Sequence, residues 1–167
     1  RAEQVKAAYK GTDMQFTEVF ETDLDTTLNY NNWENILTSN PELKAMVGLS
    51  AMETTNMGKI AKANNSDVVM AAYDPGTEAL NLLKDGYLDV CAFQNVWLEG
   101  YLPVLARMLQ EGYELNPEDN LYDGQVVTSA EVTDELMNRA QSESTMNEWY
   151  RSYIKANGLE TFGLLAK

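Results

Sequence analysis

The chain contains no histidine and a single cysteine, Cys91. Without histidine, it can build neither a Ser-His or Cys-His catalytic pair nor a zinc site of mixed cysteine and histidine ligands. One cysteine cannot close an intramolecular disulfide. The phosphate-binding, dinucleotide-binding and hydrolase patterns G-x-x-x-x-G-K, G-x-G-x-x-G and G-x-S-x-G are also missing. We therefore expect a protein that is not an enzyme and that uses no metal and no cofactor.

Basic side chains are scarce as well. The 167 residues include 12 lysines and arginines and 26 aspartates and glutamates, so the net charge is −14. Nucleic acids and anionic membranes attract basic surfaces, so we expect neither as a partner. No apolar run reaches the roughly 18 residues that a membrane-spanning helix needs. The chain begins Arg1-Ala2-Glu3, with neither an initiator methionine nor an apolar signal segment, so we expect that a preceding segment was removed.

What the sequence does contain is a regular alternation of helical and strand-like patterns. Strands are predicted at residues 16–20, 45–49, 68–73, 89–93 and 125–128. The segments between the first four strands have helical periodicity and helix caps. Strands separated by helices pair in parallel through right-handed crossovers. The order therefore predicts an α/β fold, with a Rossmann-like parallel sheet that carries helices on both faces. The run at 68–73 has no polar alternation, which predicts a strand covered on both faces.

Polar residues follow three of these predicted strands. Glu53 lies just past the second strand, Asp74 follows the third, and Gln94 and Asn95 follow the fourth. In open parallel sheets, ligands bind beyond the carboxyl ends of the strands. A carboxylate accepts two hydrogen bonds side by side, whereas an amide both donates and accepts, so this set suits neighbouring hydroxyl groups. The sequence therefore predicts a polyol site at this edge of the sheet.

The same residues also have structural interpretations. Asp74 precedes Pro75-Gly76 and could serve only as a turn or helix-capping residue. Gln94 could satisfy main-chain groups at a strand end. Cys91 falls in the middle of a predicted strand and Trp33 on the apolar face of a predicted helix, so we expect both in the core.

The stretch from Ser66 to Asn95 resembles the C-terminal lobe of the type I periplasmic sugar-binding proteins, the ribose-binding group in particular. A strand, Asp74, a turn, a helix, Lys84-Asp85-Gly86, a strand and Gln94 follow one another in the order and at the spacing of that family. Asn40-Pro41-Glu42 before the second strand is also similar to the family. The resemblance runs from residue 1 to residue 112. Beyond that, it is limited to the strand near 126–128 and the acidic helix after it.

The resemblance implies one lobe of the two-lobed type I periplasmic-binding-protein fold. Residues 1–94 would form the C-terminal sugar-binding lobe, with its first strand missing. Residues 95–125 would cross the hinge and supply a helix that packs on the N-terminal lobe, which is absent from this sequence. Residues 126–167 would contribute a return strand and C-terminal helices. The helix near residues 98–109 carries a stripe of leucines, so a lone fragment is predicted to self-associate.

The resemblance also assigns roles to individual residues. Asp74 matches the family's acceptor for ring hydroxyls, and Gln94 matches its hydrogen-bonding glutamine near the hinge. The position usually held by Asn or Asp after the preceding strand falls at Met52 or Glu53, and Met52 could not serve as a polar ligand. Leu24 replaces the aromatic residue that stacks on the sugar in many relatives. Arg1 is at best a neighbour of the ligand-binding arginine of the family.

Two functions follow from the resemblance. The first is an extracytoplasmic receptor, periplasmic or anchored as a cell-surface lipoprotein, that closes two lobes on a sugar or polyol by hinge motion. Such a receptor delivers its ligand to the permease of an ABC transporter or to a sensor. The alternative is the effector-sensing domain of a sugar-responsive transcriptional repressor, which has the same architecture with a helix-turn-helix upstream.

Overall fold

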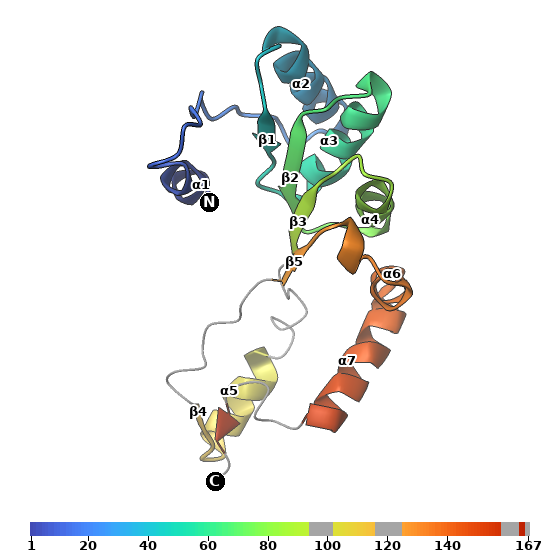
Figure 1. The fold of residues 1–167 in the computed structure, drawn as a ribbon. Helices are drawn as coiled ribbons and strands as arrows, with labels where there is room; N and C mark the ends of the chain where they lie inside the picture. Colours follow the sequence, from blue (N-terminus) through green and yellow to red (C-terminus); the bar gives the residue numbers. More distant parts are fainter. Residues whose placement is uncertain (94–101, 116–124, 158–163, 166–167) are drawn as a thin grey trace.

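The computed structural model describes residues 1–93, 102–115, 125–157 and 164–165 (Figure 1). Its main sheet has four strands in the order β1-β2-β3-β5, of which the first three are parallel and the last is antiparallel to β3. The strands are β1 (Ala45–Val47), β2 (Val69–Tyr73), β3 (Val90–Phe93) and β5 (Gln125–Val127). A mixed α/β fold with a mostly parallel sheet is thereby confirmed.

Helices connect the parallel strands as the sequence predicts. The first half of the chain forms α1 (Ala2–Ala8), α2 (Thr26–Ser39), α3 (Ala51–Asn64) and α4 (Thr77–Lys84). The second half forms α5 (Leu102–Gln110), the short 3-10 helix η2 (Ser129–Glu131), α6 (Asp134–Ala140) and α7 (Glu143–Asn157). A small second sheet pairs β4 (Glu114–Leu115) with β6 (Leu164–Leu165).

The core lies between the sheet and the helices α3 and α4. Register places Ala72 of β2 beside Cys91 of β3, and Cys91 beside Val127 of β5. These side chains form one buried cluster with Met57 of α3 and Leu80 of α4. Burial raises the pKa of the Cys91 thiol to about 12, so the thiol stays protonated. The expectation that Cys91 is a small buried hydrophobe is confirmed.

Helices α3 and α4 approach each other closely at Gly58. A Cβ atom at this position would lie 2.9 Å from Cδ1 of Leu82 and 3.0 Å from Cγ of Leu88. Both neighbours are buried side chains of the core. The lack of a side chain at Gly58 therefore allows α3 to pack closely against α4 and Leu88.

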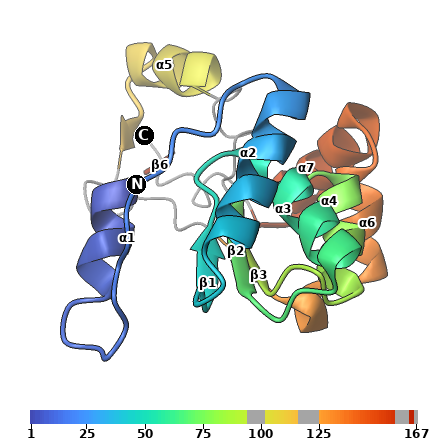
Figure 2. The same cartoon turned by 90° about the horizontal axis from the view of Figure 1, so that it is seen from above.

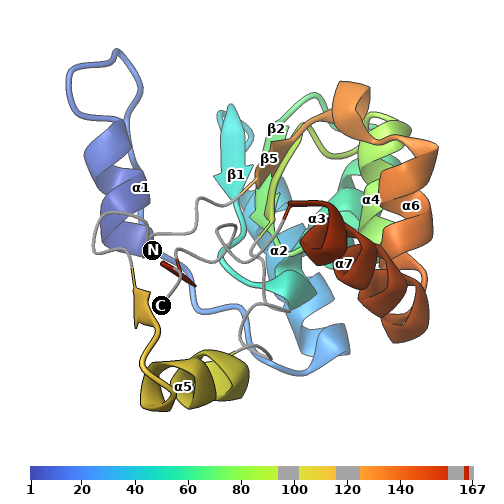
Figure 3. The ribbon, with the colours of Figure 1, turned by 90° about the horizontal axis from the view of Figure 1, so that it is seen from below.

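The strand predicted at residues 16–20 is wrong, because this segment has no regular secondary structure and joins no sheet. A strand needs a neighbour to receive its main-chain hydrogen bonds, and none of the described strands lies beside it. Helix α1 lies beyond β1, on the side away from α3 and α4 (Figures 2 and 3). The second face of β2 is consequently less covered than predicted, and Val69 is 46% exposed.

One further departure concerns the second half of the chain. The acidic helix expected after the strand near 126–128 is divided into η2 and α6, and the Thr133 hydroxyl caps α6 by accepting a hydrogen bond from the main chain of Leu136 at 3.2 Å. Figure 1 shows α5 and β4 apart from the main sheet. Self-association through the leucine stripe stays a prediction, because part of that stripe lies outside the described residues.

Candidate ligand-binding site

Two loops meet at the carboxyl ends of the parallel strands. After β1, the chain passes through residues 48–50 and enters α3, and after β2 it passes through residues 74–76 and enters α4. In a parallel sheet, these ends lie at one edge, where helices also begin with their free N–H groups. The candidate site is therefore defined by the side chains that these loops carry.

Asp74 is the first residue after β2, and its position is fixed by the main chain. Its N–H donates to the carbonyl of Ala92 in β3 at 2.8 Å. Its φ of 54° lies in the left-handed region, which aspartate tolerates better than most residues. Side chains held in this way concentrate at ligand-binding sites. The half-buried carboxylate is thus located where the ends of β2 and β3 meet, as predicted.

Glu53 lies in the first turn of α3, and its carboxylate organises the loop before it. Oε2 accepts hydrogen bonds from the main-chain N–H groups of Leu49 and Ser50, the latter at 3.0 Å, in a capping box. Oε1 accepts the hydroxyl hydrogen of Thr22 at 2.6 Å. Each carboxylate oxygen has about two acceptor positions, so Oε1 can still accept one hydrogen bond from a ligand.

Thr54 connects the loops of Glu53 and Asp74. Its side chain is fully buried, and its hydroxyl donates to the carbonyl of Tyr73, the last residue of β2. The start of α3 is therefore tied to the end of β2. Because Glu53 and Asp74 are the neighbours of these two bonded residues, both acids are carried on one rigid unit.

Arg1 brings a positive charge to the same edge. Its Nη1 donates to the carbonyl of Leu49 at 2.6 Å, and its guanidinium carbon lies 5.0 Å from the centre of the Tyr73 ring. The guanidinium offers several donors in a rigid fork, which suits oxygen acceptors. The family resemblance gives Arg1 no role of its own. A residue at the start of a helix has no local pattern that reveals which strand end it contacts.

Three further residues bear on the predicted site: Gln94, Asn95 and Leu24. Gln94 and Asn95 lie outside the described residues, directly after the end of β3 at Phe93. Leu24 lies between the Thr22 that binds Glu53 and the start of α2, and it is 83% exposed. The side chain of Leu24 is therefore accessible from solvent.

The described part of the site is suited to binding hydroxyl groups. Two carboxylates provide acceptors and a guanidinium provides donors, which is the complement that neighbouring hydroxyls require. Among the residues that the structure describes, no cluster of three Cys, Asp or Glu side chains could hold a metal ion. None of the described helices is both long and apolar enough to cross a bilayer.

No protein-family model matches the chain. A search of curated proteins finds similarity to the xylose/arabinose-binding protein XylF of Sulfolobus acidocaldarius. The two are 29% identical over 80 residues, which cover 44% of this chain and 20% of XylF. The matched part is thus a fraction of a lobe.

Solved structures give a broader match. An ABC transporter solute-binding protein from Agrobacterium vitis, solved with bound D-fucose, superimposes with a TM-score of 0.63 at 17% identity, over 84% of this chain and 48% of that one. A carbohydrate transporter solute-binding protein from Agrobacterium radiobacter, in complex with D-arabinose, gives 0.62 at 19% identity with the same coverages. The chain spans about half the length of both.

The fold is therefore that of the type I periplasmic sugar-binding proteins of ABC transporters, as the sequence resemblance implies. These are two-lobed proteins, and the described sheet with its flanking helices corresponds to a part of them. The proteins found by comparison are named for binding and transport and not for catalysis, in agreement with the expectation from the sequence.

Proposed function

We propose that the chain is the sugar-binding part of an extracytoplasmic solute receptor that serves an ABC transporter. The observation that carries the proposal is that Asp74, Glu53 and Arg1 lie together at the carboxyl edge of the sheet. Thr54, which follows Glu53, donates to Tyr73, which precedes Asp74. Leu49 donates to Glu53 through its N–H and accepts from Arg1 through its carbonyl. The ligand class is a sugar or similar polyol, because such molecules offer rows of hydroxyls to this set of donors and acceptors. The sugars held by proteins of the same fold support the same class.

Each site residue has a defined part in this proposal. Asp74 accepts hydrogen bonds from two neighbouring hydroxyls, and Glu53 accepts one more through Oε1. Gln94 and Asn95 follow β3 in the chain, and an amide side chain from these positions would donate to one hydroxyl and accept from the next. Arg1 donates to ring or hydroxyl oxygens. These groups act as hydrogen-bonding partners, and no bond of the sugar is broken.

The proposal includes a second lobe. Residues 1–94 form the C-terminal lobe. Residues 95–125 cross the hinge and supply a helix that packs on the N-terminal lobe, and residues 126–167 supply a return strand and C-terminal helices. Two features support this division: β5 returns antiparallel to β3, and α5 lies apart from the main sheet (Figure 1). Binding energy then favours the closed arrangement in which both lobes contact the ligand, and the closed form presents the receptor to the permease.

Calorimetric titration tests the function. The protein, together with its N-terminal lobe, is titrated with D-xylose, L-arabinose, D-ribose, D-fucose and myo-inositol. Saturable binding of at least one of them is expected. Asp85 is exposed and ends α4, at the opposite end of that helix from the carboxyl ends of the strands, so Asp85→Asn serves as the matched control for substitutions of Asp74. If none of the five compounds binds, the proposed ligand class is wrong.

A further inference from the structure

The loop of residues 22–25, just before α2, belongs to no helix or strand, yet its conformation is closely defined. Asp23 has a φ of 74°, in the left-handed region, and its Oδ1 accepts from the N–H of Asp25 at 2.9 Å. Leu24 between them is 83% exposed. A loop tip this exposed gains little from burying its own side chains, so its conformation depends on hydrogen bonds from the elements beside it.

Two buried asparagines form a chain of hydrogen bonds from α3 to this loop. Asn29 of α2 is 1% exposed and Asn56 of α3 is 2% exposed. Nδ2 of Asn56 donates to Oδ1 of Asn29 at 2.8 Å and to the carbonyl of Thr26 at 3.1 Å. Nδ2 of Asn29 donates in turn to the carbonyl of Asp23 at 3.1 Å. The left-handed residue of the loop is thereby bonded, through Asn29, to α3.

A second set of bonds holds the same loop at Thr22. Nδ2 of Asn32, on α2, donates to the carbonyl of Thr22 at 3.2 Å. The hydroxyl of Thr22 donates to Oε1 of Glu53, the oxygen that can still accept from a ligand. Glu53 and Asn56 are three residues apart on α3 and so lie on one face of that helix. The loop is therefore fastened to the helix face that carries a candidate ligand acceptor.

Burial of two amides at this place is better explained by orientation than by stability. A buried amide is costly unless it is hydrogen-bonded, and the net gain from each bond it forms is small. Apolar side chains of similar size would avoid that cost. Hydrogen bonds, unlike apolar contacts, have a preferred direction, so they fix how the main chain of the loop is turned. Support of this kind beneath a binding site lowers the cost of ordering it when a ligand binds.

We propose that Asn29, Asn32 and Asn56 are positioning residues for ligand binding. They hold residues 22–25 in one conformation and so fix the direction in which Glu53 presents Oε1 to the ligand. None of the three needs to touch the ligand to contribute to affinity. This inference rests on the proposed function and deepens it, because it places part of the affinity in residues behind the site.

Calorimetric titration of single variants tests the inference. The protein, together with its N-terminal lobe, is titrated with whichever of D-xylose, L-arabinose, D-ribose, D-fucose and myo-inositol the parent binds most tightly. Asn56→Ala should lower affinity by about threefold to tenfold, measured well below the unfolding temperature of the variant. In the ligand-free variant, the amide of Asp25 should exchange with solvent faster than in the parent, because the loop is held less firmly.

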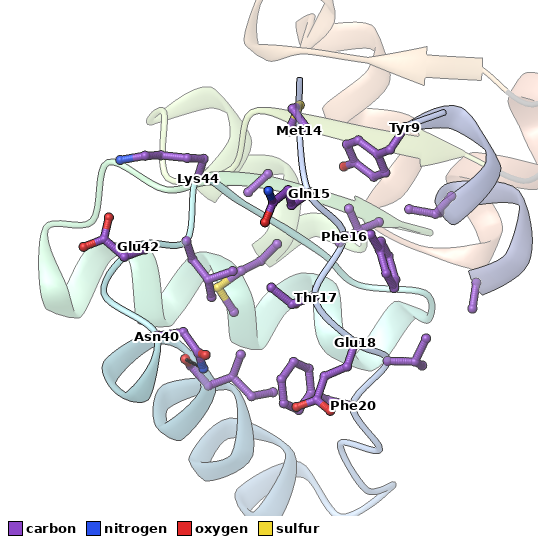
Figure 4. Close-up of a pocket in the computed structure, with 18 of the residues that line it drawn as sticks. Tyr9, Met14, Gln15, Phe16, Thr17, Glu18, Phe20, Asn40, Glu42 and Lys44 are labelled. Carbon is purple, nitrogen blue, oxygen red and sulfur yellow. Dashed lines mark hydrogen bonds between the residues drawn. The ribbon is translucent and has the colours of Figure 1, made fainter. Parts of the chain in front are cut away.

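Asn40 supplies the matched control. It follows α2 at the other end of the helix and lines a cavity of about 620 Å³ with Glu42 and Lys44 (Figure 4). Its Nδ2 donates to the carbonyl of Ile36 at 2.7 Å, so Asn40→Ala also removes a bond from an asparagine to the main chain. This variant should lose stability and keep the affinity of the parent.

Asn32→Ala provides a second test that does not disturb the core, since Asn32 is only half-buried. Because Asn32 acts through Thr22, Asn32→Ala and Thr22→Val together should lower affinity by less than the product of their separate factors. A purely structural role would lower stability and leave affinity unchanged. Parental affinity in Asn32→Ala, and in Asn56→Ala where it folds, would therefore overturn the inference and leave the proposed function intact. If the parent binds none of the five compounds, the proposed function is wrong and the inference falls with it.

Discussion

The hydroxyl of Thr22 donates to Oε1 of Glu53 at 2.6 Å, which joins the loop before α2 to the first turn of α3. Thr22 is buried, so this is a charge-assisted hydrogen bond with little access to water. The same carboxylate caps α3 through Leu49 and Ser50. The Glu53 side chain thus joins the first turn of α3 to the loop before α2 and to the loop after β1.

This relationship predicts a measurable coupling between the two residues. Thr22→Val and Glu53→Gln should each destabilise the protein by about 1–3 kcal/mol, because each leaves a polar partner unpaired. The double variant should cost less than the sum of the two, since the second change removes the group that the first left unpaired. Urea unfolding of the four proteins measures this. Strict additivity would contradict a direct bond.

Asp74→Asn should lower sugar affinity by about tenfold or more, because a hydrogen bond to a charged group contributes about 1.5–3 kcal/mol. Asparagine tolerates the left-handed backbone at this position, so the thermal midpoint should change little. Gln94→Ala should have the same effect on affinity. Calorimetric titration checks both, with Asp85→Asn as the control. Unaltered affinity in both variants would remove these residues from the site.

Leu24→Trp should raise affinity for a sugar that presents an apolar face, by about 0.5–1.5 kcal/mol. The residue is 83% exposed in the loop held by Thr22, so an aromatic ring there fits without repacking the core. Val126→Trp on β5, where the residue is 63% exposed, is the matched control. If the Leu24 variant binds every sugar as the parent does, Leu24 does not face the ligand.

Gly58→Ala should destabilise the protein by about 1–3 kcal/mol, since the added Cβ would press on the buried side chains of Leu82 and Leu88. Gly76→Ala is the control, because a Cβ at Gly76 meets nothing within 4 Å. Thermal or urea unfolding distinguishes the two. Equal stability of both variants would mean that α3 can shift away from α4 at no cost.

The buried thiol of Cys91 predicts a loss of stability at high pH. Burial raises its pKa from 9.0 to about 12, so the folded state keeps the thiol protonated while the unfolded chain ionises above pH 9. The stabilisation is therefore complete below pH 9 and is lost as the pH rises from 9 towards 12, by about 1.4 kcal/mol per unit. Unfolding at pH 8 and 10 measures it. Cys91→Ala should lose less stability over this interval than the parent.

The predictions from sequence succeed where the signal is local. The continuous apolar run before Asp74 identifies β2, and the following turn locates the acid at the strand end. No local pattern assigns a role to Arg1, because its contacts to Leu49 and Tyr73 join residues far apart in the chain. The segment at 16–20 has the composition of a strand, but composition cannot supply the neighbour with which a strand must pair.

The open edges of the main sheet have a consequence for the behaviour of the protein in solution. Within the described part of the chain, β1 and β5 each end the sheet with main-chain groups available to another molecule, and such edges promote aggregation. The net charge of −14 opposes this by repulsion between copies. Because that repulsion extends only about 8 Å at physiological ionic strength, colloidal stability is set by salt concentration as much as by folding.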